Sequence, residues 1–373
     1  MIMKTTVKLK DIASYSKGSQ INGNNLIENG TYEYLNGGIN PSGKWNEYNV
    51  DGNTITISEG GNSCGYVNYM INPFWCGAHC YYLYDLKCPS EYLYYALKGN
   101  QSSIMKLRSG ACMPNIKKKD LGEFVLSIDL DKNEQDRVIA IFNCLSSIIT
   151  HRRTQLEKLD LLVKARFVEM FGDIYTNKYD LPICQLSDYI TFLTSGSRGW
   201  AKYCTENGAE WFITIKNVKA CKITTHNIQR LNAPDNMEAK RTKVQEDDLL
   251  ISITADLGRT GVVTKEIAEH GAYINQHLTC IRLNKSKINP IYAAYFMESD
   301  SGRTQFETKN QTGVKAGLNF DSIKSLKTLV PPLALQTQFS DFVKQVDKSK
   351  ATVQKALDEA QLLFDSLMQE YFG

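Results

Sequence analysis

The feature that most constrains the fold is an internal duplication of a long helical segment. Residues 133–172 and 334–373 each run for 40 residues without a gap, and both end in Glu-x-Phe-Gly. The matched positions include Gln135 and Gln336, Leu156 and Leu357, and Leu162 and Leu363. Because self-similarity at a fixed offset is the signature of a repeat architecture, the chain is expected to consist of two related halves.

Both copies carry an apolar stripe with the alternating 4-3 spacing of a coiled-coil seam. The first stripe, interrupted by Arg152 and Arg166, is Val138, Phe142, Leu145, Ile149, Arg152, Leu156, Leu159, Val163, Arg166 and Met170. The second, interrupted by Lys350, is Phe339, Val343, Val346, Lys350, Val353, Leu357, Ala360, Phe364, Leu367 and Tyr371. At 1.5 Å per residue each helix should be about 50 to 60 Å long. Two such stripes can bury each other, so the sequence predicts an antiparallel helix pair.

The segments that precede the helices also correspond, more loosely. Residues 54–58 and 248–252 are strand-like, and each leads through a glycine-rich turn to a second strand signal at 65–67 or 261–263. His79 aligns with His277, and the turn at Gly110 (109–116) aligns with the turn at Gly313 (312–319). Helical stretches at 90–98 and 290–298 complete a mixed pattern, which predicts two α+β domains.

The predicted organisation is domain, helix, domain, helix with approximate two-fold symmetry. The expected boundaries are 1–130 and 173–329 for two recognition domains, and 131–172 and 330–373 for the two helical spacers. The loops differ between the domains, as residues 40–45 and 196–203 illustrate. Two unlike heads held at a fixed distance suit a ligand with two unlike sites at fixed spacing, and duplex DNA is such a ligand.

Composition limits the alternatives without deciding among them. The chain has 373 residues, 42% of them apolar, but no apolar run approaches the roughly 20 residues that span a bilayer. Residues 1–8 lack a signal-peptide pattern, so a cytoplasmic protein is expected. Ten scattered cysteines are then expected to be reduced. A net charge of +3 neither requires nor excludes a nucleic-acid partner.

Two segments make the chain resemble the specificity subunit of type I restriction-modification systems. They are Leu-Val-Lys-Ala-Arg-Phe-Val-Glu-Met-Phe-Gly at 162–172 and Pro-Pro-Leu-Ala-Leu-Gln at 331–336, within the repeated order of variable domain and helix. The resemblance covers the whole chain. It implies that each variable domain reads one half of a bipartite, asymmetric DNA sequence, and that the helices set the gap between the halves.

The same resemblance implies partners and cofactors outside this chain. Two methyltransferase subunits, which bind S-adenosylmethionine, are expected to dock around the helices. A restriction (translocase) subunit, which uses ATP and Mg²⁺, is an additional partner in systems that cleave DNA. The chain itself is expected to bind DNA without catalysis and without a cofactor or metal of its own.

Base reading requires Arg, Lys, Asn or Gln on loops that reach groove edges, with further cations on phosphates. In the first domain the candidate residues are Lys44, Trp45, Asn62, Arg108, Asn115, Lys117, Lys118 and Lys119. In the second domain they are Arg198, Lys202, Lys216, Arg241, Lys243, Arg259, Lys309, Lys315 and Asn319. The turns at Gly110 and Gly313 are expected to lie against DNA.

Three other interpretations remain open. Asn72-Pro73-Phe74-Trp75 superficially resembles the Asn-Pro-Pro-Tyr motif of DNA amino-methyltransferases, but the second proline and a glycine-rich cofactor turn are missing. Cys76, His79 and Cys80 suggest zinc, yet the second domain keeps only His277, so structural, buried histidines are the simpler interpretation. The chain also lacks a Gly-x-x-x-x-Gly-Lys-Ser/Thr phosphate loop. A scaffold with two protein-binding modules is the third interpretation.

Overall fold

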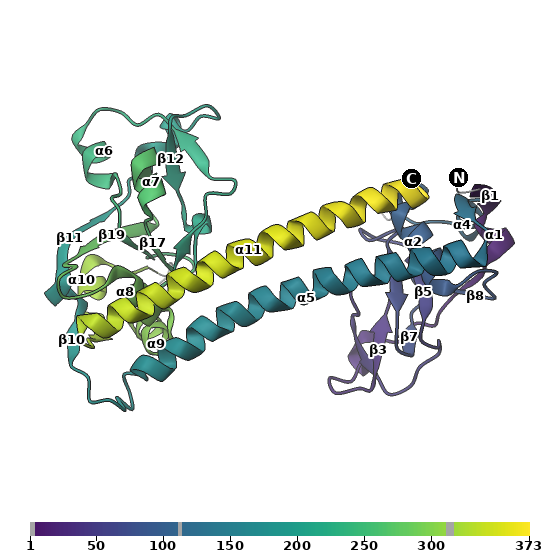
Figure 1. Cartoon of the computed structure of the whole chain (residues 1–373), viewed down its shortest axis with the longest axis horizontal. Coiled ribbons are helices and arrows are strands. Elements are labelled where there is room, and N and C mark those ends of the chain that lie inside the picture. The colour runs from purple at the N-terminus through teal and green to yellow at the C-terminus, as the bar shows by residue number, and fades with distance from the viewer. Residues whose placement is uncertain (1–3, 111–113, 311–316) are drawn as a thin grey trace. The chain divides into compact units, whose positions relative to one another are not determined.

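The structure is a computed structural model that describes residues 4–110, 114–310 and 317–373. The chain divides into two compact units (Figure 1). Unit 1 comprises residues 1–155 and 353–373, and unit 2 comprises residues 156–352. Two 40-residue helices, α5 (Lys132–Phe171) and α11 (Leu333–Phe372), each contribute one end to each unit. Each unit is therefore a globular domain together with two helix ends.

The described residues of unit 1 form three small sheets. Its strands are β1 (Lys4–Lys8), β2 (Ser14–Lys17), β3 (Tyr32–Leu35), β4 (Gly43–Trp45), β5 (Thr54–Ser58), β6 (Val67–Met70), β7 (Phe74–Cys76), β8 (Cys80–Tyr84) and β9 (Val125–Asp129). Its short helices are α1 (Leu9–Ile12), η1 (Gly23–Asn25), α2 (Ser90–Gly99), α3 (Gln101–Met105) and α4 (Lys118–Gly122). The sheet orders are β2-β8-β5-β6, β4-β3-β7 and β1-β9, and only the β3–β7 pairing among these is parallel.

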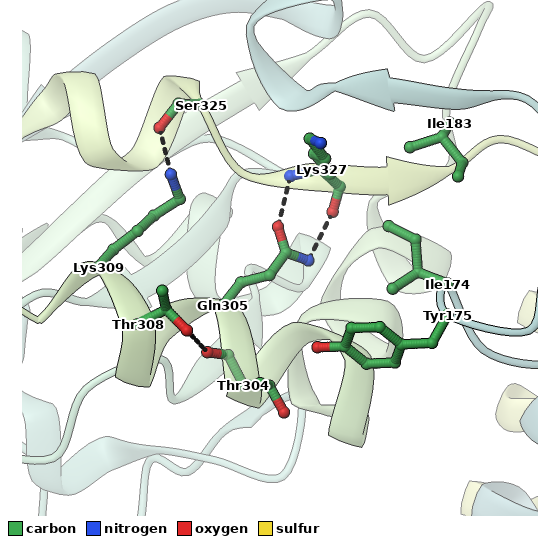
Figure 2. A pocket seen from close by; sticks show the side chains of 9 residues that line it. All are labelled: Ile174, Tyr175, Ile183, Thr304, Gln305, Thr308, Lys309, Ser325 and Lys327. Atoms are coloured by element: carbon green, nitrogen blue, oxygen red, sulfur yellow. Dashed lines mark hydrogen bonds between the residues drawn. The ribbon is translucent and has the colours of Figure 1, made fainter.

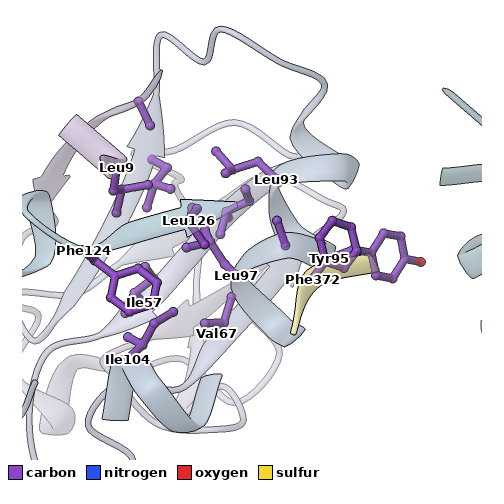
Figure 3. Packing of buried hydrophobic residues seen from close by; sticks show 14 of the residues in the cluster. Leu9, Ile57, Val67, Leu93, Tyr95, Leu97, Ile104, Phe124, Leu126 and Phe372 are labelled. Carbon is purple, nitrogen blue, oxygen red and sulfur yellow. The ribbon is translucent and has the colours of Figure 1, made fainter. Parts of the chain in front are cut away.

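The core of unit 1 joins the four-stranded sheet to both long helices. Ile57 and Val67 of the sheet and Leu93 and Leu97 of α2 are fully buried in one cluster (Figure 3). Phe142 of α5 and Phe372 of α11 belong to the same cluster. The start of α5 and the end of α11 thus pack together on this domain, which requires the two helices to run in opposite directions here.

Unit 2 repeats this architecture. Its strands are β10 (Ile183–Gln185), β11 (Ile190–Ser195), β12 (Glu210–Ile213), β13 (Val218–Lys219), β14 (Lys222–Ile223), β15 (Gln229–Leu231), β16 (Leu249–Ser252), β17 (Thr260–Val262), β18 (Ala272–Ile274), β19 (Leu278–Leu283) and β20 (Lys327–Leu329). Its shorter helices are η2 (Leu186–Tyr189), η3 (Arg198–Tyr203), η4 (Ile215–Asn217), α6 (Met237–Thr242), α7 (Lys265–His270), α8 (Pro290–Glu298), α9 (Asp300–Lys309) and α10 (Phe320–Lys324). The orders β11-β19-β16-β17, β15-β12-β18 and β10-β20 mirror unit 1, and β13-β14 is an added hairpin.

The core of unit 2 has the same relation to the long helices. Phe167 and Phe171 at the end of α5 contact Phe339 near the start of α11, with ring centroids 5.3 and 5.6 Å apart. Tyr292 of α8 packs on both phenylalanines of α5. The helices therefore run antiparallel in this unit as well.

These observations confirm the predicted fold class of two α+β domains with an antiparallel helix pair and an internal duplication. The strands predicted at 54–58 and 248–252 correspond to β5 and β16, and the helices predicted at 90–98 and 290–298 correspond to α2 and α8. The boundaries proposed for the recognition domains stay a prediction. The helices of the described residues include none that is long and apolar enough to cross a membrane.

The predicted seam residues are buried or half-buried along both helices, and Lys350, which interrupts the second stripe, forms an ion pair with Asp160 of α5. A second buried stripe was missed by the sequence reasoning. Phe167 and Phe171 of α5, like their repeat counterparts Met368 and Phe372 of α11, lie outside the predicted seam and pack in the cores that the long helices share with the globular domains. Each helix is thus apolar on two adjacent faces where it meets a domain.

Candidate nucleic-acid interface

Four loops of unit 1 meet at one end of the four-stranded sheet, around the glycine-rich turn of unit 1 (residues 59–65). The Gly61 N–H donates to Pro114 O at 3.0 Å, and the Ile116 N–H donates to Glu59 O at 2.8 Å. These bonds join the turn to residues 114–116, and Asn115 in turn pairs with the backbone of Ser109, so that the segments carrying Asn62, Arg108 and Asn115 are neighbours. Gly61 and Gly65 adopt φ of 74° and 87°, which side chains other than glycine rarely tolerate.

Buried and charged side chains hold this turn in place. The Ser58 hydroxyl, at the end of β5, donates to the carbonyl of Gly37 and lies 3.3 Å from the Ser63 hydroxyl. Glu59 forms an ion pair with Lys17 through one carboxylate oxygen, and its second oxygen lies 3.5 Å from His79 Nδ1. The loops at 17–20, 36–38 and 77–79 are thereby tied to the turn. A carboxylate between an ammonium group and an imidazole is thus part of this surface.

The remaining predicted residues of unit 1 lie on neighbouring elements. Lys117 precedes α4, and Lys118 and Lys119 are exposed in its first turn, where the Lys118 ammonium lies 5.6 Å from the Tyr15 ring. Lys44 and Trp45 lie in β4 of the three-stranded sheet, with Trp45 opposite Tyr32 of β3. They therefore lie on a different sheet from the one whose end carries the loops of Asn62, Arg108 and Asn115.

Unit 2 builds the same end of its four-stranded sheet from different side chains. The equivalent turn of unit 2 (residues 253–259) contains one glycine, Gly258, and keeps the name glycine-rich turn of unit 2 for its matching place. It is held by Ser252, whose hydroxyl donates to Asp256 O and accepts from the Arg259 N–H at 2.9 Å. The Leu318 N–H donates to Ile253 O at 2.9 Å, as Ile116 does to Glu59 in unit 1. His277 Nδ1 lies 2.6 Å from the Thr254 hydroxyl. The two units share the buried serine and the segment that crosses the turn, called here the crossing loop, which contains Ile116 in unit 1 and Leu318 in unit 2. The polar side chains around the turn differ between the units.

The structure separates the predicted residues of unit 2 into two groups. Arg198 follows Ser197, whose backbone forms an isolated parallel β-bridge with Asn275, and Arg241 donates to Ser195 O at 3.0 Å. Arg198 and Arg241 therefore both lie close to the end of β11. Arg259 lies in the turn and forms an ion pair with Asp256. The other group lies further along the chain or on other elements: Lys202 in η3, Lys216 in η4, Lys243 at the end of α6, Lys309 in α9 and Asn319 before α10. Lys315 and the Gly313 turn lie outside the described residues.

Two of these side chains have structural partners. Asn319 caps α10, since its side-chain oxygen accepts from the Ser322 N–H at 2.7 Å. The Lys309 ammonium donates to the Ser325 hydroxyl at 2.8 Å and lines a pocket of about 370 Å³ between α9 and β20 (Figure 2). The floor of this pocket is stiffened by Gln305, whose amide pairs with both backbone groups of Lys327. Sequence reasoning could have found the Asn319 cap, because asparagine followed by Phe-Asp-Ser is a helix-start signal.

The sequence alignment of the two crossing loops was wrong by one residue. It equated Ile116 with Asn319, whereas the shared hydrogen bonds equate Ile116 with Leu318. The expectation of buried histidines also needs correction, because the His79 side chain is 60% exposed and faces Glu59. The matched histidines were a signal that pointed to this end of each sheet, but Lys17, Glu59 and Thr254 were missed.

Several residues of the rival motifs are part of the core of unit 1, although Asn72 and His79 are exposed. Phe74 is fully buried in β7, and the Trp75 indole N–H donates to Ser19 O at 2.7 Å. Cys76 and Cys80 are buried, and the neighbouring Cys80 thiol together with burial raises the pKa of the Cys76 thiol, which keeps it protonated. Within residues 4–110, 114–310 and 317–373, no group of three or more His, Cys, Asp or Glu side chains is arranged to hold a metal ion.

Comparison with known proteins defines the class of protein. The family described as type I restriction modification DNA specificity domain matches residues 2–160 and 202–361. The chain therefore belongs to this family, and both halves of the duplication carry the domain.

Individual relatives agree with this assignment. The chain is 26% identical over 339 residues to the type I restriction enzyme StySPI specificity subunit of Salmonella potsdam, which covers 84% of this chain and 72% of that protein. It is 39% identical over 136 residues to a protein of Mycoplasma pneumoniae assigned as a type I specificity subunit. That match covers 36% of each protein, so it spans about a third of the relative's length.

The solved structure of a type I restriction-modification S subunit from M. genitalium has the same fold. It superimposes with a TM-score of 0.65 at 20% identity, covering 100% of this chain and 96% of that chain. At this identity the likeness concerns the fold alone.

Proposed function

We propose that this chain is the sequence-specific DNA-binding subunit of a type I restriction-modification complex, in which each unit reads one half of a bipartite, asymmetric target. One observation carries the proposal. Both units assemble the same sheet end from a glycine-rich turn, a buried serine and a crossing loop, yet they present different polar side chains there. A shared scaffold with unlike side chains suits two unlike half-sites.

The side chains at these sheet ends have the chemistry of base and phosphate recognition. In unit 1 we propose Asn62, Asn115 and Arg108 as groove contacts, with Lys117–Lys119 on phosphates. Lys44 and Trp45 would extend the contact from the second sheet. In unit 2, Arg198, Arg241 and Arg259 would read the groove, because a guanidinium can bind guanine with two hydrogen bonds. The flanking cations of unit 2 would contact phosphates, and they are Lys202, Lys216, Lys243, Lys309 and Lys315.

The long helices are proposed to set the gap between the half-sites and to dock two methyltransferase subunits. A matched pair of exposed leucines supports the docking. Leu161 of α5 and Leu362 of α11, at equivalent repeat positions, are 62% and 72% exposed, and Leu162 and Leu363 are 48% and 49% exposed. The same apolar pair on each unit suits two copies of one partner, since large exposed aliphatic side chains gathered together mark interaction sites.

Methylation and cleavage are then proposed to reside in the partners. S-adenosylmethionine would be bound by the methyltransferase subunits, and ATP and Mg²⁺ by a restriction subunit where the system has one. The role of this chain is selection of the DNA sequence.

The DNA-reading proposal is tested by selecting bound duplexes from a random library with the full chain and sequencing them. The expected result is one motif made of two unlike halves with a fixed gap. Affinity for a duplex with that motif should fall steeply as salt rises, because each neutralised phosphate releases counterions. Absence of an enriched motif, or a flat salt response, would favour the protein-binding scaffold instead.

The docking proposal is tested by co-expressing the chain with its methyltransferase subunit and weighing the complexes by mass photometry. Leu161→Asp with Leu162→Asp should remove one methyltransferase copy, and Leu362→Asp with Leu363→Asp should remove the other. Ile148→Asp is the matched control, because Ile148 is 40% exposed on α5 but its repeat counterpart is Ser349. Retention of both copies by the leucine variants would contradict the proposal.

A further inference from the structure

The strand that follows each glycine-rich turn, called here the exit strand, is an edge strand of its sheet and begins with a fully buried residue. Val67 opens β6 opposite Ile57, and Thr260 opens β17 opposite Ile251, so the two residues occupy the same place in their sheets. β6 and β17 are each the last strand in the order of the four-stranded sheet. The backbone groups of Val67 and Thr260 that point away from the sheet therefore need partners from elsewhere.

In unit 1 these partners are a glutamine and a lysine. Gln101 Oε1 accepts from the Val67 N–H at 3.2 Å, and the Lys98 ammonium donates to Val67 O at 3.0 Å. Lys98 also donates to Gln101 Oε1 at 2.8 Å and lies 3.9 Å from the centre of the Tyr66 ring. Both outward groups of Val67 are satisfied by this pair.

Unit 2 also uses an acceptor oxygen and a cation, but these come from different positions along the chain. Glu298 Oε1 accepts from the Thr260 N–H at 2.8 Å, and Arg303 donates to the second oxygen of Glu298 at 2.7 Å. Glu298 is only 15% exposed. Lys98 and Glu298 both lie in the last turn of the helix that packs against the exit strand, α2 on β6 and α8 on β17. The cation and the acceptor have exchanged places along the chain.

The helices that carry these pairs also pack on the long helices. Tyr95 of α2 stacks on Phe142 of α5 at 4.9 Å, and Tyr295 of α8 meets Phe339 of α11 edge-on at 5.2 Å. Each pair thus ties the exit of a glycine-rich turn to a helix that is itself held by the long helices. An exit strand without its pair would leave a buried N–H unsatisfied.

We infer that Lys98 with Gln101, and Glu298 with Arg303, are positioning residues that fix the two glycine-rich turns for reading their half-sites. This inference rests on the proposed DNA-reading function. The residues act through Val67 and Thr260 and make no contact with bases in this assignment. Loss of one pair should therefore impair one half-site and spare the other.

The test uses the full chain and the random-library selection, followed by affinities for duplexes altered in one half at a time. Lys98→Met should weaken discrimination in the half read by unit 1 by about tenfold, the cost of one unsatisfied buried group. Glu298→Gln, which removes the charge but keeps the shape, should weaken the other half. Lys98→Arg keeps both donated bonds and should restore wild-type discrimination. The matched controls are Lys106→Met and Glu307→Gln, at exposed residues of the same regions.

The outcomes separate the two levels of the argument. If the wild-type chain selects no motif, the proposed DNA-reading function fails. If it selects a two-part motif and the variants select it with unchanged discrimination, the positioning role is refuted. Equal loss in both halves would also refute it, because that result indicates general destabilisation. If Lys98→Met does not fold, Gln101→Leu takes its place in the test, because it removes the other partner of Val67, the acceptor of the Val67 N–H.

Discussion

Lys98 makes the stability of unit 1 depend on pH in an unusual direction. Burial lowers the pKa of its ammonium from 10.5 to about 8. Between these two values the folded chain has released the proton while the unfolded chain still holds it. Because the unfolded state binds more protons in this window, the free energy of unfolding should rise with pH from about 8 to about 10.5. Below pH 8 the cost of burying the charge is present in full.

The magnitude follows from the size of the pKa change. A full unit of pKa corresponds to about 1.4 kcal/mol, so the change from 10.5 to about 8 gives an upper limit of about 3.5 kcal/mol over the window. Lys98 is only partly buried, and solvent screening reduces this to about 1 to 3 kcal/mol. The charged groups of the described residues form no ion pair with Lys98; its neighbours are Gln101, Tyr66 and the carbonyl of Val67. No carboxylate therefore offsets the cost.

Lys98→Met lacks the titrating group, so its stability should not show this rise. The difference between wild type and variant should grow by about 1 to 3 kcal/mol between pH 8 and 10.5. Pulsed proteolysis in urea with subtilisin, with fragments of the two units quantified separately by mass spectrometry, measures the difference for unit 1 alone. Unit 2 fragments and the exposed-lysine variant Lys106→Met serve as controls. A difference that stays constant with pH would refute the reasoning.

Three further predictions concern the core and the candidate DNA surface. Phe142→Ala should lower the free energy of unfolding of unit 1 by about 3 to 5 kcal/mol in urea titration, because Phe142 is fully buried where both long helices meet the domain. Arg282→Leu should lower that of unit 2 by about 3 to 5 kcal/mol, since it leaves the fully buried carboxylate of Asp248 without its ion-pair partner; an unchanged urea midpoint would contradict this. Replacing Arg108 and Lys117–Lys119 with alanine should weaken DNA binding and bring the negative slope of log affinity against log salt closer to zero by about 1 for each lost phosphate contact.

The long helices could be predicted from the sequence because their information is local and periodic. The 4-3 spacing identified the seam, and the buried and half-buried positions follow it along α5 and α11. Phe167 and Phe171 were missed because they lie outside that period and contact a domain as well as the partner helix. A helix that packs on two neighbours has two apolar stripes, and a search for one period finds only one of them.

The candidate site was predictable in its ingredients and not in its assembly. The glycine-rich turns and the crossing loops were recognised from the sequence. In unit 1 they meet where Gly60 pairs with Asn115, which lies far from it along the chain, and no local pattern encodes that pairing. Side-chain direction was equally hidden: Lys309 turns toward Ser325, and Asn319 caps a helix. A cationic or amide residue in a loop indicates a capacity for hydrogen bonding, and only the fold decides which partner uses it.

The exchanged pairs explain why the internal alignment fails where the geometry is most similar. When Lys98 is aligned with Glu298, the charge at this position is reversed. Both units nevertheless share an acceptor oxygen that binds the first N–H of the exit strand, and a cation that donates to the side chain carrying this acceptor. The acceptor is supplied by Gln101 in one unit and by Glu298 in the other. Since the backbone N–H fixes the need for an acceptor, any side chain that reaches it can meet that need. Swapping a single member, as in Lys98→Glu, would set a carboxylate against the Val67 carbonyl and the Gln101 amide oxygen, so it should disrupt the turn of unit 1 even though glutamate stands at the equivalent position of unit 2.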